Sequence, residues 1–216
     1  MNTKQPFVIT ISRELGSGGR TIGRQLAAQL NVRYSDKNLI HGLMNKFKLT
    51  ASEIEQIKAK KKNWLADLLE VVAPVPNSGA YIGFEAGKSI LPSSLKEQDI
   101  YEAECEILHE IAAEGSCVVA GRSGFFVLKD HPNKVDIFIT AGRESRIARV
   151  MKKQSLTREQ AEAVIDDIDK GRENYIKRFA GVSRYDARNY DLVMNVEDMT
   201  EEEAVACILK YLKFQK

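Results

Sequence analysis

The chain has 216 residues, of which 44% are apolar and 29% are charged; this balance is ordinary for a folded domain and excludes a chain that is disordered throughout. The formal net charge of +2 argues against nucleic acid or an anionic membrane as the main partner, so any recognition of anions must be local. Three scattered cysteines, no apolar segment at the start and no apolar run of roughly 18 residues together predict a cytoplasmic protein with reduced thiols.

The predicted elements alternate between strands and helices. Residues 7–12, FVITIS, form a β-branched apolar run that ends in a glycine cluster, which is typical of a buried parallel strand. From residue 20 to residue 30 the apolar side chains recur at helical spacing. Further strands are expected within 31–36, 116–124, 134–140 and 190–195, and further helices at 37–47, 50–72, 96–115, 143–154, 157–181 and 200–214.

This alternation predicts an α/β fold with five strands in a doubly wound parallel sheet. We expect a single domain whose core is formed by residues 1–41, 96–150 and 186–216. The segments 42–95 and 151–185 are interpreted as insertions that rise over the carboxyl ends of the strands, where folds of this kind bind ligands.

A glycine-rich loop joins the first strand to the first helix. The usual phosphate loop has the pattern G-x-x-x-x-G-K-[ST]. Aligned with it, this chain has Glu14 in place of the first glycine and Arg20 in place of the lysine. Arginine can fork onto two phosphate oxygens, and the Thr21 hydroxyl can bind Mg²⁺. In the helix at 143–154, Arg149 is expected to lean toward the same phosphates. The alternative is a plain strand-to-helix turn; the residues predicted to bind phosphate are Gly16, Ser17, Gly18, Gly19, Arg20, Thr21 and Arg149.

Six segments occur in a fixed order: ITISRELGSGGRTIGRQLA, YSDKNLI, SCVVAGRSG, FITAGRESRIARV, IDDIDKGRENYIKRF and YDLVMN. In that order and spacing they resemble the cytidylate-kinase-like branch of the P-loop nucleoside monophosphate kinases. The resemblance covers nearly the whole chain and is weakest across 48–95. It implies a three-layer P-loop NTPase fold with an acceptor-binding insertion at 42–95 and a lid at 151–185. It also implies ATP and Mg²⁺ as cofactors and phosphoryl transfer to a nucleoside monophosphate, with CMP or dCMP as the acceptor.

The lid pattern of that family, R-D-x-x-D-x-x-R, matches this chain at Asp166, Asp169 and Arg172, and Ile165 replaces its first arginine. A lid arginine can neutralise the charge that spreads over a transferring phosphoryl group. A solvated helix with paired charges is the alternative for this segment. The residues to which the resemblance assigns catalytic roles are Arg20, Asp169 and Arg172.

The acceptor-binding residues match the family less well. Its Asp-Gly-Arg-Asp pattern falls on residues 120–123, where this chain has Ala-Gly-Arg-Ser, and its phosphate-gripping arginine falls on Gly42. The residues carried over as acceptor-binding are Asp36, Lys37, Arg122 and Asp166. Because of these departures, two other functions remain open: phosphoryl transfer to another small acceptor, and nucleotide binding without turnover. The sequence leaves the oligomeric state open.

Overall fold

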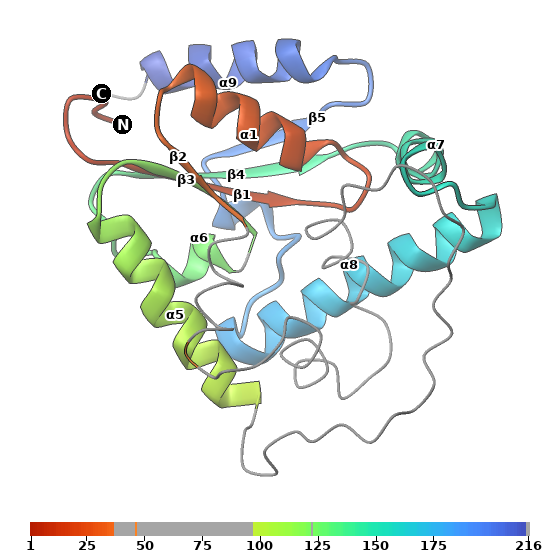
Figure 1. Ribbon diagram of the computed structural model, residues 1–216, viewed down its shortest axis with the longest axis horizontal. Helices are drawn as coiled ribbons and strands as arrows, with labels where there is room; N and C mark the ends of the chain where they lie inside the picture. The colour runs from red at the N-terminus through yellow and green to blue at the C-terminus, as the bar shows by residue number, and fades with distance from the viewer. Residues whose placement is uncertain (37–45, 47–96, 122, 215–216) are drawn as a thin grey trace.

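The structure is a computed structural model that describes residues 1–36, 46, 97–121 and 123–214 (Figure 1). The helices predicted at 37–47 and 50–72, and nearly all of the insertion predicted at 42–95, lie outside these residues. The described part contains the five predicted strands, the glycine loop and the segment predicted as a lid.

The five strands form one parallel sheet in the order β2-β3-β1-β4-β5. Their bounds are β1 Val8–Arg13, β2 Arg33–Ser35, β3 Cys117–Ala120, β4 Lys134–Thr140 and β5 Leu192–Asn195. β1 lies at the centre, where Ile9 is paired with Val118 of β3 and with Val135 of β4. The prediction of a doubly wound parallel sheet is therefore confirmed.

Helices cover both faces of this sheet (Figure 1). On one face lie α1 Gly19–Gln29 and α9 Glu201–Phe214, which also contact each other. On the other lie α5 Glu97–Ala113, α6 Gly124–Val127 and α8 Arg158–Ala180. The remaining elements are α7 Arg143–Gln154, which follows β4, and the 3-10 turn η1 Ala187–Asn189, which precedes β5.

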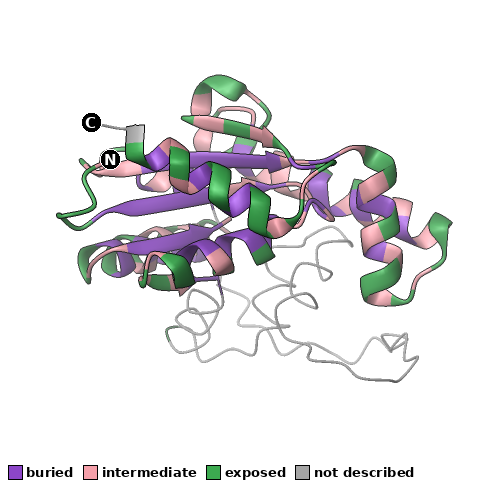
Figure 2. Cartoon of the chain, turned by 90° about the horizontal axis from the view of Figure 1, so that it is seen from above, coloured by how far each residue is buried: buried purple, intermediate pink, exposed green. Residues whose placement is uncertain are grey.

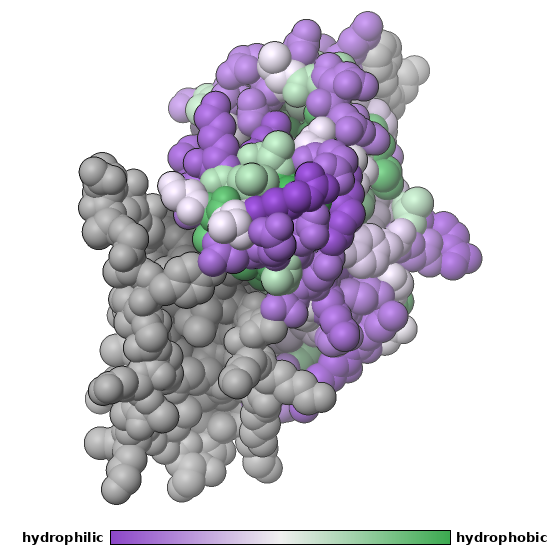
Figure 3. All heavy atoms as spheres, turned by 90° about the vertical axis from the view of Figure 1, so that its right-hand side faces the viewer, coloured by the Kyte–Doolittle hydropathy of each residue, from purple (hydrophilic) through white to green (hydrophobic). Residues whose placement is uncertain are grey.

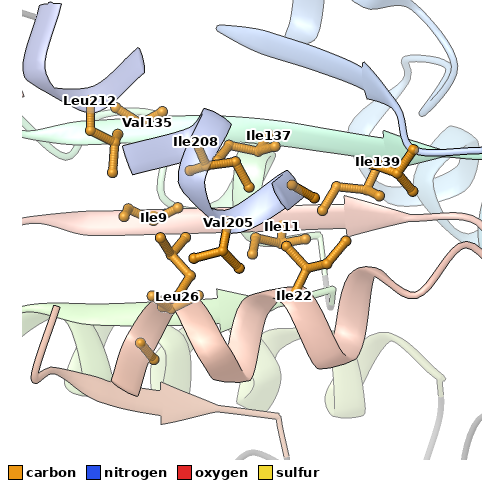
Figure 4. Packing of buried hydrophobic residues seen from close by; sticks show 14 of the residues in the cluster. Ile9, Ile11, Ile22, Leu26, Val135, Ile137, Ile139, Val205, Ile208 and Leu212 are labelled. Atoms are coloured by element: carbon orange, nitrogen blue, oxygen red, sulfur yellow. The ribbon is translucent and has the colours of Figure 1, made fainter. Parts of the chain in front are cut away.

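The core follows from the two-residue period of the strands. Ile9 and Ile11 of β1 point toward α1 and α9, where they pack with Ile22 and Val205 (Figure 4). Val8 points to the opposite face and packs with residues of α5. The central strands are accordingly buried along most of their length (Figure 2). Each fully buried isoleucine contributes roughly 1.5–3 kcal/mol, so the carboxyl end of β1 is a rigid base for the loop that follows it.

The helix α8 is attached to the rest of the protein near both of its ends. Near its start, Ile165 packs with Ile147 of α7 and with Leu15 of the glycine loop. Near its end, the Phe179 ring stacks on the Tyr101 ring of α5, with the ring centres 4.3 Å apart. The segment predicted as a lid is thus mostly a single long helix that spans from α7 to α5 (Figure 1).

The surface formed by α7 and the first half of α8 is largely hydrophilic (Figure 3). Exposed ion pairs join the two helices there, between Arg143 and Asp166 and between Arg158 and Glu144. None of the described helices is both long and apolar enough to cross a membrane.

Candidate active site

The glycine loop needs glycine at two positions. Gly16 and Gly18 have φ angles of +82° and +84°, a conformation that side chains rarely adopt. Space is also limiting, because a Cβ atom at Gly16 would lie 2.7 Å from the Arg146 carbonyl oxygen and one at Gly18 would overlap Arg149 Nη1. Gly18, in its left-handed conformation, is the N-cap of α1, and because glycine has no polar side chain, no side-chain hydrogen bond caps the helix there. The loop therefore ends at the positive end of a helix dipole, an arrangement that attracts phosphate.

Within the loop, Ser17 and Thr21 occupy different environments. The Ser17 hydroxyl is buried and donates to the Glu14 carbonyl oxygen at 2.9 Å, so it holds the loop closed on itself. Thr21 is exposed on the first turn of α1. Mg²⁺ at phosphate sites keeps several waters and binds through one or two protein oxygens together with the phosphates. The Thr21 hydroxyl fits that requirement, and the described residues contain no group of three metal-ligating side chains that would hold a metal on its own.

Two arginines of α7 lie against the loop. Arg149 Nη1 donates to the Gly16 carbonyl oxygen at 3.2 Å, which places this predicted phosphate-binding residue beside the loop. Arg146 is buried, and its Nη1 donates to Asp169 Oδ2 at 2.6 Å and lies 3.3 Å from the Leu15 carbonyl oxygen. A regular helix after β4 brings both side chains to one face because they are three residues apart.

Asp169 of α8 connects the predicted lid to the loop. Its Oδ1 accepts from the Leu15 amide at 3.0 Å and from Arg172 Nη1 at 3.3 Å, while Arg146 bonds its other oxygen. Arg172 Nη1 also lies 3.1 Å from the Arg13 carbonyl oxygen. Two of the residues with implied catalytic roles, Asp169 and Arg172, are thus brought directly to the start of the loop.

Arg20 lies on the first turn of α1, and its side chain is buried rather than exposed to solvent. Its exposure is 8%, and its Nε lies 2.7 Å from Asp36 Oδ2. The two atoms are not aligned for a hydrogen bond, so the contact is a close ion pair. Asp36 is itself buried at the end of β2, and a buried carboxylate requires a cation. That requirement explains why the Arg20 side chain turns toward β2.

The surroundings of this ion pair are dry. The Tyr34 hydroxyl donates to the Arg20 carbonyl oxygen at 3.3 Å. Burial raises the pKa of Tyr34 to about 12, with a further increase from the charge of Asp36 that the neighbouring arginines oppose. The pair therefore sits in a region where its charges are weakly screened.

Of the four residues predicted to bind the acceptor, the two that the structure describes, Asp36 and Asp166, have different partners. Asp36 pairs with Arg20, whereas Asp166 is exposed and forms a forked ion pair with Arg143, at 2.6 and 2.9 Å. This pairing lowers the pKa of Asp166. Asp166 also lines a depression of about 370 Å³, together with Asp169, Arg146 and Glu14. Lys37 and Arg122, the other two predicted acceptor residues, lie outside the described residues.

Sequence reasoning missed Arg13 and the packing of Arg184. Arg13 is the last residue of β1 and is 8% exposed. Arg184 is 3% exposed, donates through Nη2 to the Arg13 carbonyl oxygen, and stacks on the Phe138 ring. Burial, followed by the nearby charge of Arg172, lowers the pKa of Arg184. The sequence feature that could have identified Arg13 as a site residue is a charged residue at the end of an apolar strand, immediately before the glycine loop.

Together these side chains give the loop a positive environment. Five guanidinium groups and four carboxylates near the loop have side chains that are at most 15% exposed, which leaves an excess of one positive charge among the described residues. They are Arg13, Arg20, Arg146, Arg172 and Arg184, with Glu14, Asp36, Asp169 and Glu173. Such an excess at the end of a parallel sheet fits an anionic ligand.

Comparison with known proteins gives a consistent result. The model of the cytidylate kinase-like family matches residues 8–198. A cytidylate kinase of Sulfurisphaera tokodaii is 25% identical to this chain over 211 residues, which is 96% of both chains.

Solved structures show the same fold. An uncharacterized protein from Eubacterium ventriosum has a TM-score of 0.67 and 21% identity, with 97% of this chain and 99% of the other covered. The shikimate kinase of Bacteroides thetaiotaomicron has a TM-score of 0.55 and 15% identity, with 96% and 99% covered. At these identities the likeness establishes the fold alone, which is the P-loop NTPase α/β fold.

Proposed function

The chain belongs to the cytidylate kinase-like family, and on that basis we propose that it is an ATP- and Mg²⁺-dependent nucleoside monophosphate kinase with CMP or dCMP as its acceptor. The family and the fold support a kinase that acts on a nucleotide or another small molecule. The cytidylate kinase of Sulfurisphaera tokodaii, which is similar over nearly the whole chain, supports the narrower choice of acceptor.

The observation that carries the proposal is the positive environment around the glycine loop. Two left-handed glycines, the start of α1, four buried guanidinium groups and the partly buried guanidinium of Arg172 converge on one end of the sheet. A triphosphate at neutral pH carries several negative charges and needs such convergent donors. This arrangement supports the binding of a nucleotide, and membership of the family supports phosphoryl transfer.

In the proposed reaction the protein supplies position and charge. The loop amides and the α1 dipole hold the donor phosphates, and Arg149 and Arg172 contribute positive charge next to them. Thr21 would hold Mg²⁺, which neutralises phosphate charge when bound. A phosphate oxygen of the acceptor attacks the γ-phosphorus in line, and the bond to the bridging oxygen breaks toward ADP. No residue of the protein becomes phosphorylated in this scheme.

A second candidate function is phosphoryl transfer to a hydroxyl group of a small acceptor. It is favoured by Asp36, because a carboxylate at the end of β2 accepts a hydrogen bond from a hydroxyl and repels a phosphate. The pairing of Asp36 with two arginines weakens that repulsion, so the nucleotide acceptor stays the first choice.

The test is ADP release from ATP with a panel of nucleoside monophosphates, with the nucleosides as controls that lack the phosphate. We expect turnover with CMP or dCMP above that with the purine nucleotides. Turnover with a hydroxyl acceptor and with no nucleotide would favour the second candidate. Tight ATP binding without any turnover would reject both.

A further inference from the structure

Arg13 follows a path that two glycines make possible. A Cβ atom at Gly19 would lie 2.7 Å from Arg13 Cβ, and one at Gly121 would overlap Arg13 Nη1. Gly121 directly follows β3 and has a φ angle of +78°. The Arg13 side chain therefore passes between the start of α1 and the end of β3, through a space that any larger residue at either position would fill.

Within the described part of the chain, the Arg13 guanidinium has a single and distant acidic partner. Among the described residues its one acidic partner is Asp36, whose Oδ1 lies 4.0 Å from Arg13 Nη2. Asp36 is shared with Arg20, which is closer, at 2.7 Å. A guanidinium carries five N–H donors, and burying it without hydrogen bonds is costly. Arg13 is 8% exposed and its carboxylate partner among the described residues is distant and shared, so a bound anion would complete its charge pairing there.

The backbone of Arg13 is held firmly even though its guanidinium is not. Its carbonyl oxygen accepts from Arg172 and from Arg184, and its strand pairs with both β3 and β4. The side chain is thus presented from a fixed position, as a binding group must be.

The direction of the side chain identifies the part of the ligand that it would meet. Arg149 contacts the loop from α7, which follows β4 on one side of β1. Arg13 extends to the other side of β1, over the end of β3 and toward Asp36 at the end of β2. The chain leaves β2 into the segment expected to bind the acceptor. Arg13 therefore faces the acceptor side of the loop, opposite Arg149.

We propose that Arg13 binds the phosphate group of the acceptor and that Asp36 holds its guanidinium in place when this phosphate is absent. The inference rests on the proposed function, because it takes the loop as the donor site and a phosphate-bearing small molecule as the acceptor. Arg13 is then a substrate-binding residue, and a planar guanidinium can hold two phosphate oxygens at once.

The experiment is a titration with inorganic phosphate, followed by calorimetry, of protein saturated with Mg²⁺ and the non-hydrolysable ATP analogue AMP-PNP, which blocks the glycine loop. We expect Arg13→Met to weaken phosphate binding at least tenfold and Arg13→Lys to weaken it less, since lysine keeps the charge and loses the fork. Circular dichroism checks that each variant is folded.

Two glycine variants test the same idea without removing the arginine. Gly121→Ala displaces the guanidinium and should weaken phosphate binding by a similar factor. Gly181→Ala is the matched control, because Gly181 has a similar φ angle of +70° with no atom near the added methyl, and it should leave phosphate binding unchanged.

The outcomes separate this inference from the proposed function. Phosphate binding that is absent in the wild type, or unchanged in Arg13→Met, overturns the inference, whatever the turnover assay shows. Phosphate binding that depends on Arg13 upholds it, even if no nucleoside monophosphate is phosphorylated and the proposed function fails.

Discussion

The ion pair of Arg20 and Asp36 leads to a quantitative prediction about stability. Their side chains are 9% and 4% exposed, so solvent screens the pair little. Removing one partner of a buried pair costs roughly 3–5 kcal/mol because the other charge is left uncompensated. For Arg20→Met we expect the lower end, about 3 kcal/mol, because Arg13 stays within 4.0 Å of Asp36.

This energy converts into a measurable shift in melting temperature. With 216 residues and an unfolding entropy of about 2.1 cal/mol/K per residue, one degree corresponds to about 0.45 kcal/mol. Arg20→Met should therefore melt about 7 °C lower than the wild type. Asp36→Asn should be destabilised as well, because it leaves two buried guanidinium groups without their carboxylate. The stability loss of the double variant should be clearly smaller than the sum of the losses of the two single variants, as expected for residues in contact.

The assay is calorimetry of the ligand-free protein, with Arg24→Met as the control. Arg24 lies on the same helix and is exposed, so its loss should cost less than about 0.5 kcal/mol. If Arg20→Met melts within a degree or two of Arg24→Met, or if the two losses in the double variant are additive, the reasoning about a buried ion pair is wrong.

Three further predictions concern the loop, the thiols and the predicted lid. Gly18→Ala should weaken AMP-PNP binding at least tenfold in calorimetry, because its methyl group would overlap Arg149 Nη1. The control variant Gly115→Ala adds a methyl group in open space and should leave AMP-PNP binding unchanged. Equal losses of affinity in the two variants would count against the loop geometry. Burial raises the pKa of Cys117 to about 11, so at pH 8 a thiol reagent should modify the exposed Cys207 first and leave Cys117 intact until the protein unfolds; early labelling of Cys117, seen by mass spectrometry, would contradict this. Amide hydrogen exchange in 151–185 and in 42–95 should slow when ATP and acceptor are added together, and identical exchange with and without ligands would reject closure of these segments.

The sheet and the approximate position of each strand were predictable from the sequence because local signals agree with the tertiary structure. The run at residues 7–12 is mostly apolar and β-branched, and the central strand β1 is buried along most of its length. The helix predicted at 157–181 also begins where α8 does, and the structure shows that Thr157 and Gln160 form a reciprocal capping box there. These signals depend on residues close in sequence, and so they can be recognised without the fold.

The environment of the charged residues could not be predicted in the same way. Arg20 and Asp36 are sixteen positions apart, and they meet because α1 packs against β2 while β2 pairs with β3. The contacts of Asp169 with Leu15 and Arg146 likewise depend on how α8 crosses the loop. The lid pattern pointed to Asp169 and Arg172, yet it gave no sign that Arg172 contacts the Arg13 carbonyl oxygen.

The departures of the loop from the usual phosphate-loop pattern are linked by charge. Glu14, in place of a glycine, adds a carboxylate that accepts from the Thr140 hydroxyl and lies 3.7 Å from Arg146 Nη2. Asp36 adds another, which pairs with Arg20. A lysine at position 20 could lose its proton in a dry site, whereas an arginine stays charged and can bridge a carboxylate and a ligand with different N–H groups. An arginine therefore suits a loop in which carboxylates already neutralise part of the positive charge. Ligand phosphates would compete with Asp36 for the Arg20 guanidinium, which stays charged.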